Sequence, residues 1–101
     1  MLPFCAMDNL TWKQWQRRLR LAKKVAWTAA ALYEDSTKRF LGRSLTRADA
    51  LHIAAGDEVR RGNWEFYLSE TKRSLVLVNP DRGLRFTRGL REPPPQAFYD
   101  W

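Results

Sequence analysis

The clearest pattern of apolar and polar positions lies in residues 62–91. Apolar side chains alternate with polar ones at 64–68 and again at 84–87, which is the two-residue period of a β-strand with one buried face. Between them, residues 75–78 form a continuous apolar run, as expected for a central strand covered on both faces. Residues 79–83, NPDRG, have the chemistry of a tight turn. The pattern predicts three antiparallel strands.

The first half of the chain has the period of a helix. Thr11 and Gln14 have the spacing of a capping box, and apolar positions then recur at intervals of three and four between residues 12 and 33. This pattern predicts one long helix that ends at Gly42. Residues 34–36, EDS, favour helix starts over helix interiors, so a break at that point is an open alternative.

A second helix is predicted at residues 47–61, because Thr46 and Asp49 repeat the capping arrangement. The order helix, helix, strands indicates an α+β fold, in which one long and one shorter helix pack on a small three-stranded antiparallel sheet. At 101 residues the chain is expected to form a single domain, residues 1–101.

The two ends of the chain differ from this body. Residues 1–9 have no periodic pattern and are expected to form a loose lead-in. Residues 92–101 form a tail in which three consecutive prolines precede aromatic residues. This tail either folds back over the open edge of the sheet or docks onto a partner, and we favour the first arrangement.

Composition narrows the range of partners. The net charge is +7 and the pI is about 10.2, which favours a nucleic acid, an anionic membrane surface or an acidic protein. Cys5 is the only cysteine and His52 the only histidine, so an internal disulfide is excluded and we expect neither a metal site nor a cofactor. No apolar run is long enough to span a membrane. We therefore expect a soluble cytoplasmic protein, whose oligomeric state the sequence leaves open.

Four cations share one face of the long predicted helix, because they recur at spacings of four, three and four. This cationic stripe consists of Lys13, Arg17, Arg20 and Lys24. Such a stripe can follow the phosphates of a nucleic acid, or it can be an ordinary solvated helix face. Trp12, Trp15 and Trp27 lie nearby in the sequence and either stack on bases or belong to the core.

A second candidate site lies on the last predicted strand. Arg85, Thr87 and Arg91 are expected on one side of it, with Tyr67 on a neighbouring strand. Guanidinium groups in this arrangement can hold a phosphate and stabilise the charge that develops when a phosphodiester is cleaved. A solvated sheet face is the alternative. His52 is the only side chain whose ordinary pKa suits proton transfer near neutral pH, although a lone helical histidine is also a common boundary residue.

The segment from Trp64 to Arg91 resembles the hairpin region of small bacterial ribonuclease toxins of the colicin D, colicin E5 and RelE-like group. The similar parts are an aromatic strand, a polar turn, the run SLVLVNPD and the strand GLRFTRGLR. The resemblance implies metal-independent cleavage of RNA, commonly transfer RNA, by the neighbouring 2′-hydroxyl. It matches Thr87 to a hydroxyl-bearing position on the last strand. The Lys and His cluster of colicin D-like toxins has no counterpart here, so the general base would be His52 or Tyr67.

The sequence therefore predicts a small basic nucleic-acid-binding protein, with RNA favoured over DNA. An endoribonuclease toxin that acts on transfer RNA, with His52, Thr87 and Arg85 as its catalytic groups, is the enzymatic form of this hypothesis. The alternative is a non-catalytic inhibitor or adaptor, encoded by a phage or plasmid, that binds an acidic surface of a host nucleic-acid-processing complex. A protein that uses the basic helix at a membrane surface is a third interpretation.

Overall fold

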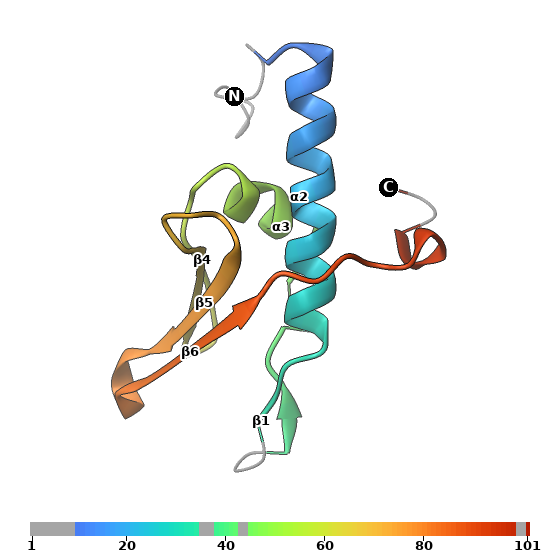
Figure 1. Ribbon diagram of the computed structural model, residues 1–101. Helices are drawn as coiled ribbons and strands as arrows, with labels where there is room; N and C mark the ends of the chain where they lie inside the picture. Colours follow the sequence, from blue (N-terminus) through green and yellow to red (C-terminus); the bar gives the residue numbers. More distant parts are fainter. Residues whose placement is uncertain (1–9, 35–37, 43–44, 99–100) are drawn as a thin grey trace.

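The computed structural model describes residues 10–34, 38–42, 45–98 and 101. It has the α+β architecture that the sequence predicts, with two helices against an antiparallel sheet (Figure 1). The helices are α2 (Trp12–Ala30) and α3 (Arg47–Ala54). The main sheet has the order β3 (Val59–Arg61), β4 (Trp64–Leu68), β5 (Ser74–Asn79) and β6 (Leu84–Gly89). The predicted lead-in, residues 1–9, lies outside the described residues.

The sheet has four strands, so the predicted number of three was wrong. The additional strand is β3, which the sequence placed at the end of the second helix. Helix α3 ends earlier because the chain turns at Gly56, where φ is +98°, a conformation that favours glycine. Val59 then pairs with Phe66 of β4. The predicted helix at 47–61 is therefore a helix of eight residues followed by a turn and a strand.

Helix α2 begins at the predicted capping box and ends earlier than predicted. The Gln14 N–H donates to Thr11 Oγ1 over 3.2 Å, and the Thr11 N–H donates to Gln14 Oε1 over 2.9 Å. After Ala30 the chain forms a small hairpin of β1 (Tyr33–Glu34) and β2 (Arg39–Phe40). The helix therefore does not continue to Gly42. Asp35 and Ser36, where a break was considered, lie outside the described residues.

Gly42 has a packing role in place of the predicted helix-ending one. A Cβ atom at this position would lie 2.2 Å from the carbonyl oxygen of Ala29, so the backbone after the hairpin lies directly against α2. Any larger residue would push this segment away from the helix. The close approach is a tertiary contact, which the helical period of the sequence does not reveal.

The turn between β5 and β6 forms as predicted. Residues Pro80–Arg82 make one turn of 3₁₀ helix, and Gly83 has φ +63°. The side chain that caps the turn is Asn79, whose Oδ1 accepts a hydrogen bond of 3.3 Å from the Arg82 N–H. The turn fixes the β5–β6 register, in which Leu77 lies opposite Phe86.

The register divides the sheet into a covered face and an open face. Phe66 and Leu77 are fully buried on the covered face, where Ile53 of α3 and Val25 of α2 join the same core. On the open face, strand partners place Arg60, Glu65, Val78 and Arg85 in one row. Polar residues of this row are therefore available to solvent on the side away from the helices.

The tail folds back, but onto α2 and not over the edge of the sheet (Figure 1). The Arg91 N–H donates to Thr28 Oγ1 over 2.9 Å, and Glu92 pairs with Lys24 over 3.3 Å. Further along, the rings of Phe98 and Trp101 lie 4.7 Å apart. In the described part of the chain no strand pairs with the outer edge of β6, so the predicted covering of that edge was wrong.

Candidate nucleic-acid interface

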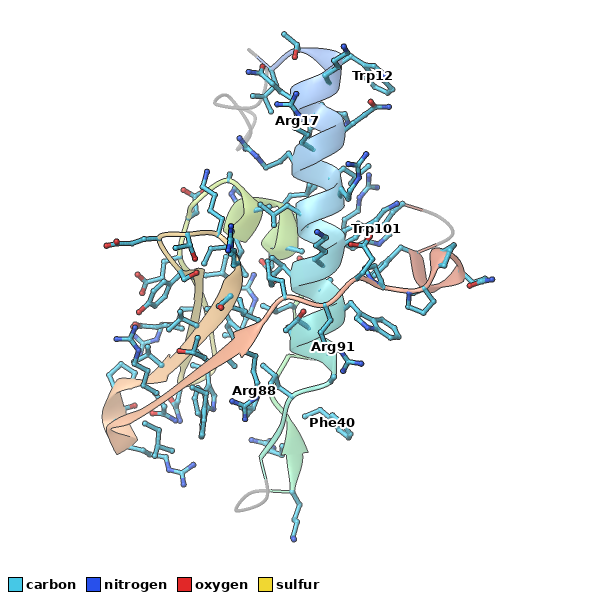
Figure 2. The ribbon with its side chains drawn as sticks, viewed as in Figure 1. Trp12, Arg17, Phe40, Arg88, Arg91 and Trp101 are labelled. Atoms are coloured by element: carbon cyan, nitrogen blue, oxygen red, sulfur yellow. The ribbon has the colours of Figure 1, made fainter. Side chains whose placement is uncertain are left out.

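The first half of α2 extends beyond α3 and the sheet (Figure 1). None of residues 11–20 is fully buried, and the side chain of Trp12 is 70% exposed. Figure 2 shows Trp12 and Arg17 at this end of the helix, away from the core. The buried contacts of α2 come from its second half, through Ala22, Val25 and Ala29. The helix is thus anchored at one end and available to a partner at the other.

The available half of α2 carries positive charge without any carboxylate. Six lysines and arginines lie between residues 13 and 24, and the whole helix contains no Asp or Glu. Among the described residues, the only ion pair made by these six cations joins Lys24 to Glu92. Lys13, Arg17 and Arg20 of the cationic stripe are exposed. Within the described residues, the stripe therefore presents charge that no carboxylate compensates at Lys13, Arg17 and Arg20.

This arrangement is electrostatically unfavourable in the free protein. Lys13 and Arg17 are four residues apart, as are Arg20 and Lys24, so like charges adjoin each other on the helix. The positive end of the helix dipole lies at the same N-terminal end and repels cations further. An anionic partner would relieve both effects, because it supplies the opposite charge that the helix lacks.

Arg91 lies with this stripe and not with Arg85. Its backbone is bonded to Thr28, which is four residues beyond Lys24 and therefore about 6 Å further along the helix axis. Figure 2 shows Arg91 beside α2. The structure thus extends the cationic stripe by one residue from the tail and separates the arginines that the sequence had grouped on one strand.

Arg85, Thr87 and Tyr67 share the open face of the sheet, as the alternation predicts. Arg85 and Thr87 are exposed on β6. Tyr67 is on β4, with Val76 of β5 between it and Thr87. Two strand spacings separate them, about 10 Å, so these side chains do not converge on one phosphate.

The other edge of the open face carries compensated charges. Arg60 Nη1 lies 3.5 Å from Glu65 Oε2. The pKa of the exposed Glu58 carboxyl is raised above its ordinary value, because the protonated carboxyl donates a hydrogen bond to Glu65 and because the negative charge of Glu65 disfavours a second carboxylate. Arg60 partly opposes this shift. Two neighbouring carboxylates make this edge a poor place for a polyanion.

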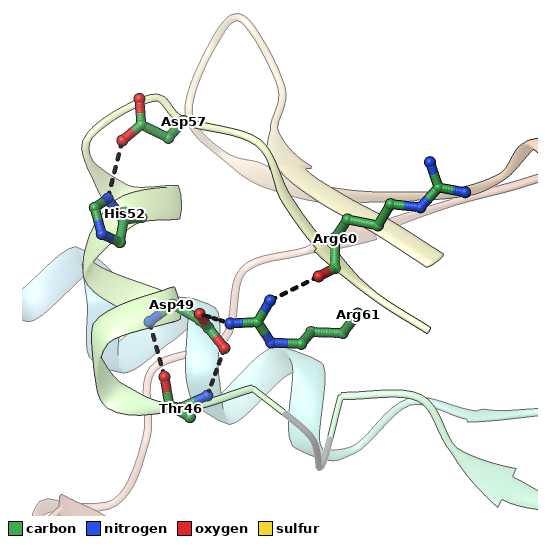
Figure 3. Close-up of polar contacts among 6 residues, drawn as sticks. All are labelled: Thr46, Asp49, His52, Asp57, Arg60 and Arg61. Carbon is green, nitrogen blue, oxygen red and sulfur yellow. Dashed lines mark hydrogen bonds and ion pairs between the residues drawn. The ribbon is translucent and has the colours of Figure 1, made fainter. Parts of the chain in front are cut away.

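His52 lies at the far edge of the sheet from the other proposed catalytic residues. Its Nδ1 is 3.1 Å from Asp57 Oδ2 (Figure 3), beside an open hollow of about 470 Å³ that Arg60 also lines. Arg60 and Arg85 stand at opposite ends of one row across four strands, a separation of about 14 Å. The structure therefore does not bring His52, Thr87 and Arg85 into one active site.

Asp49 and Arg61 form a polar cluster with a structural role (Figure 3). The Asp49 carboxylate is buried, accepts the Thr46 N–H over 2.9 Å in the capping box of α3, and pairs with the Arg61 guanidinium. Arg61 also donates to the carbonyl oxygen of Arg60 over 2.7 Å. The capping box was predicted, but the ion pair was not, because it joins positions twelve residues apart.

A pocket lined by aromatic side chains lies where the tail meets α2. Its volume is about 430 Å³, and its walls include Trp27 of α2 with Phe98 and Trp101 of the tail. The guanidinium of Arg47 lies 5.7 Å from the centre of the Trp101 ring. The sequence pointed to Trp27 as a stacking candidate, but it gave no signal that the tail would complete a pocket around it.

The described part of the chain contains neither a metal-binding cluster nor a membrane-spanning helix. It contains no group of three or more His, Cys, Asp or Glu side chains placed to hold a metal ion. Neither described helix has the length and hydrophobicity needed to cross a membrane. Comparison with family models, curated proteins and solved structures gives no match to this chain. The resemblance to ribonuclease toxins therefore depends on the hairpin residues alone.

Proposed function

We propose that this protein binds nucleic acid, with RNA favoured, through the exposed face of α2 and without catalysing its cleavage. The observation that carries the proposal is the cationic stripe on a helix that extends from the body, contains no carboxylate and has one ion pair among the described residues. Charge that no neighbour compensates costs stability in the free protein. A polyanion offsets that cost when it binds.

The spacing of the charges suits a polymer of phosphates better than a single anion. Lys24 lies eleven residues beyond Lys13, so the stripe extends about 16 Å along the helix axis. Arg91 extends it by about another turn. A row of cations of this length can contact several successive phosphates, and each contact releases counterions. We place this binding in the cytoplasm, as the sequence led us to expect.

Cleavage of RNA has weaker support than binding. His52, the residue assigned as the base, lies at the β3 edge of the sheet, whereas Arg85 and Thr87 lie together on β6 at the other edge. This separation gives no support to a base and a phosphate holder acting on one bond. We expect transfer RNA to remain intact when it is incubated with an excess of the protein. Specific cleavage in that assay would restore the ribonuclease hypothesis.

The test compares two double variants that remove the same charge from different surfaces. Arg17→Gln with Arg20→Gln alters the stripe, and Arg73→Gln with Arg85→Gln alters exposed positions near the sheet. Binding to a fluorescein-labelled RNA strand is followed by anisotropy. We expect the helix variant to bind at least about tenfold more weakly and the sheet variant to change by less than about twofold.

Salt titration provides the second measurement. For the unaltered protein, log K should fall steeply with log salt concentration. The slope should decrease by about 0.7 for each phosphate of a single strand that a variant no longer neutralises. Equal reductions of affinity in the two double variants would remove α2 as the interface. Absent or salt-insensitive binding to both RNA and DNA would overturn the proposal and favour an acidic protein as partner.

A further inference from the structure

We infer that the aromatic pocket between α2 and the tail receives an unpaired nucleobase, so that the protein prefers single-stranded over double-stranded nucleic acid. This inference rests on the proposed function, because it takes the cationic stripe as the part that holds the phosphates. It adds a substrate class: a flexible strand whose bases are free to leave the stack.

The pocket has the size and the walls that a base requires. At about 430 Å³ it lies within the range of small-molecule sites. Trp27 and Ala30 form the side contributed by α2, and Phe98 and Trp101 form the side contributed by the tail. Flat aromatic walls suit a base because every base has a π-face that stacks on such rings.

The pocket also continues the cationic stripe. Lys13, Arg20 and Trp27 are seven residues apart in turn, and residues at this spacing stay on nearly one face of a helix, with a drift of about 20° per heptad. Arg20 lies about 10 Å before Trp27 along the axis, and Lys23 about 6 Å before it. A strand whose phosphates contact Lys13, Arg17 and Arg20 is therefore directed along the helix toward Trp27.

Charge complementarity identifies the occupant. Arg47 lies at the pocket with its guanidinium over Trp101, which holds that ring by a cation–π contact and leaves positive charge beside the opening. An apolar peptide would gain nothing from this arginine or from the stripe that leads to it. A nucleotide uses both, because it joins a flat apolar base to an anionic phosphate.

Double-stranded nucleic acid fits this arrangement less well. A paired base cannot enter a pocket unless it first leaves its helix, which costs unstacking and unpairing energy. The deep major groove of an RNA duplex is too narrow for side chains to read. The DNA major groove does admit a helix, so binding of α2 in that groove is the outcome that would contradict the inference.

The experiment uses three probes of about 12 nucleotides and two matched variants of Trp27. The probes are oligouridylate, an abasic strand with the same backbone charge, and an RNA duplex of the same length. The unaltered protein should bind oligouridylate about tenfold more tightly than the abasic strand. It should also prefer oligouridylate to the duplex, although the duplex carries more charge. Trp27→Leu should remove this preference, while Trp27→Phe, which keeps a ring, should retain most of it.

The results separate this inference from the proposed function. If all three probes bind to the unaltered protein with equal affinity and a steep salt dependence, the stripe binds phosphates but the pocket takes no base, and the inference fails alone. If no probe binds, the proposed function fails as well. Because the probe comparison uses the unaltered protein, it decides the question even if Trp27→Leu does not fold.

Discussion

The exposed face of α2 and the open face of the sheet both carry arginines, but a carboxylate compensates only the arginine at the β3 edge of the sheet, Arg60. On the sheet, Arg60 pairs with Glu65, and Glu58 lies close enough to Glu65 for their charges to interact. On α2 no carboxylate exists within the helix, and the described part of the chain supplies one, Glu92. The surface of α2 and the β3 edge of the sheet thus differ in how many carboxylates lie beside their cations.

This difference shows which part of the net charge of +7 points to an anionic partner. When a carboxylate lies beside a cation, the positive charge is already compensated, and it gives no reason to expect a binding partner. The row of cations on α2 is destabilised both by the helix dipole and by the spacing of like charges. Locally unfavourable arrangements of this kind are expected at functional sites. The unequal compensation supports the proposal that α2, and not the sheet, is the interface.

The largest effect on stability is expected at the ion pair whose carboxylate is buried, Asp49–Arg61. Replacing Asp49 with Ala removes one of the two hydrogen bonds of the α3 capping box, the one that the Thr46 N–H donates, and leaves Arg61 without its carboxylate. We expect a loss of about 2 kcal/mol in the free energy of unfolding, since Arg61 is partly exposed and keeps some hydration. Urea unfolding measures the loss, and RNA affinity of the folded variant should be unchanged.

Asp81→Ala is the matched control, because it removes the same charge from an exposed position in the β5–β6 turn. It should change stability by less than about 0.5 kcal/mol. A loss of RNA affinity in Asp49→Ala, measured at a temperature where the variant is folded, would show that the Asp49–Arg61 cluster takes part in binding. The distinction between ion-paired residues with a structural role, such as Asp49 and Arg61, and the binding surface of α2 would then be wrong.

A smaller effect of opposite sign is expected on α2. Arg17→Gln combined with Arg20→Gln should raise the free energy of unfolding by about 0.5 kcal/mol at low salt, because it relieves like-charge neighbours and the unfavourable dipole interaction. The gain should vanish at high salt. With saturating RNA the order should reverse, since the unaltered protein gains more stability from the ligand. Thermal unfolding with and without RNA measures both differences.

Arg60→Gln provides the comparison on the sheet. It removes an arginine that already has a carboxylate beside it, so the free protein should gain no stability from the change. Equal gains in the helix and sheet variants would mean that overall charge, and not local compensation, sets the cost.

Local signals in the sequence were enough to predict much of the fold. Both capping boxes, at Thr11 and Thr46, form as predicted, and so does the β5–β6 turn with Gly83 at positive φ. Each of these depends on residues within five positions of one another. The end of α2 depends on longer-range packing, in which Gly42 lies against Ala29, and the sequence offered no such pairing.

The candidate site was also predictable only where it depends on local sequence signals. The cationic stripe follows from helical spacing, so its exposure on one face was expected and Lys13, Arg17 and Arg20 are exposed. Arg91 was grouped with Arg85 because alternation was extended past Gly89, where β6 ends. The contacts of the tail with Thr28 and Lys24 join segments more than sixty residues apart. Periodicity has no access to contacts at that distance.

The smallest effect concerns the carboxylates of the sheet and has a defined pH dependence. The Glu58 carboxyl has its pKa raised above the ordinary value of 4.5, chiefly by Glu65. A raised pKa in the folded state means that the folded protein is favoured below the ordinary value and loses this advantage as pH rises through the raised one. Glu58→Gln should therefore match the unaltered protein below about pH 4.5 and be slightly more stable at pH 7.

Glu70→Gln, an exposed change in the β4–β5 turn, is the control and should show no such trend. If Glu58→Gln stabilises the protein equally at acid and neutral pH, the carboxylate pair is not the cause, and the sheet face is less compensated than its geometry indicates.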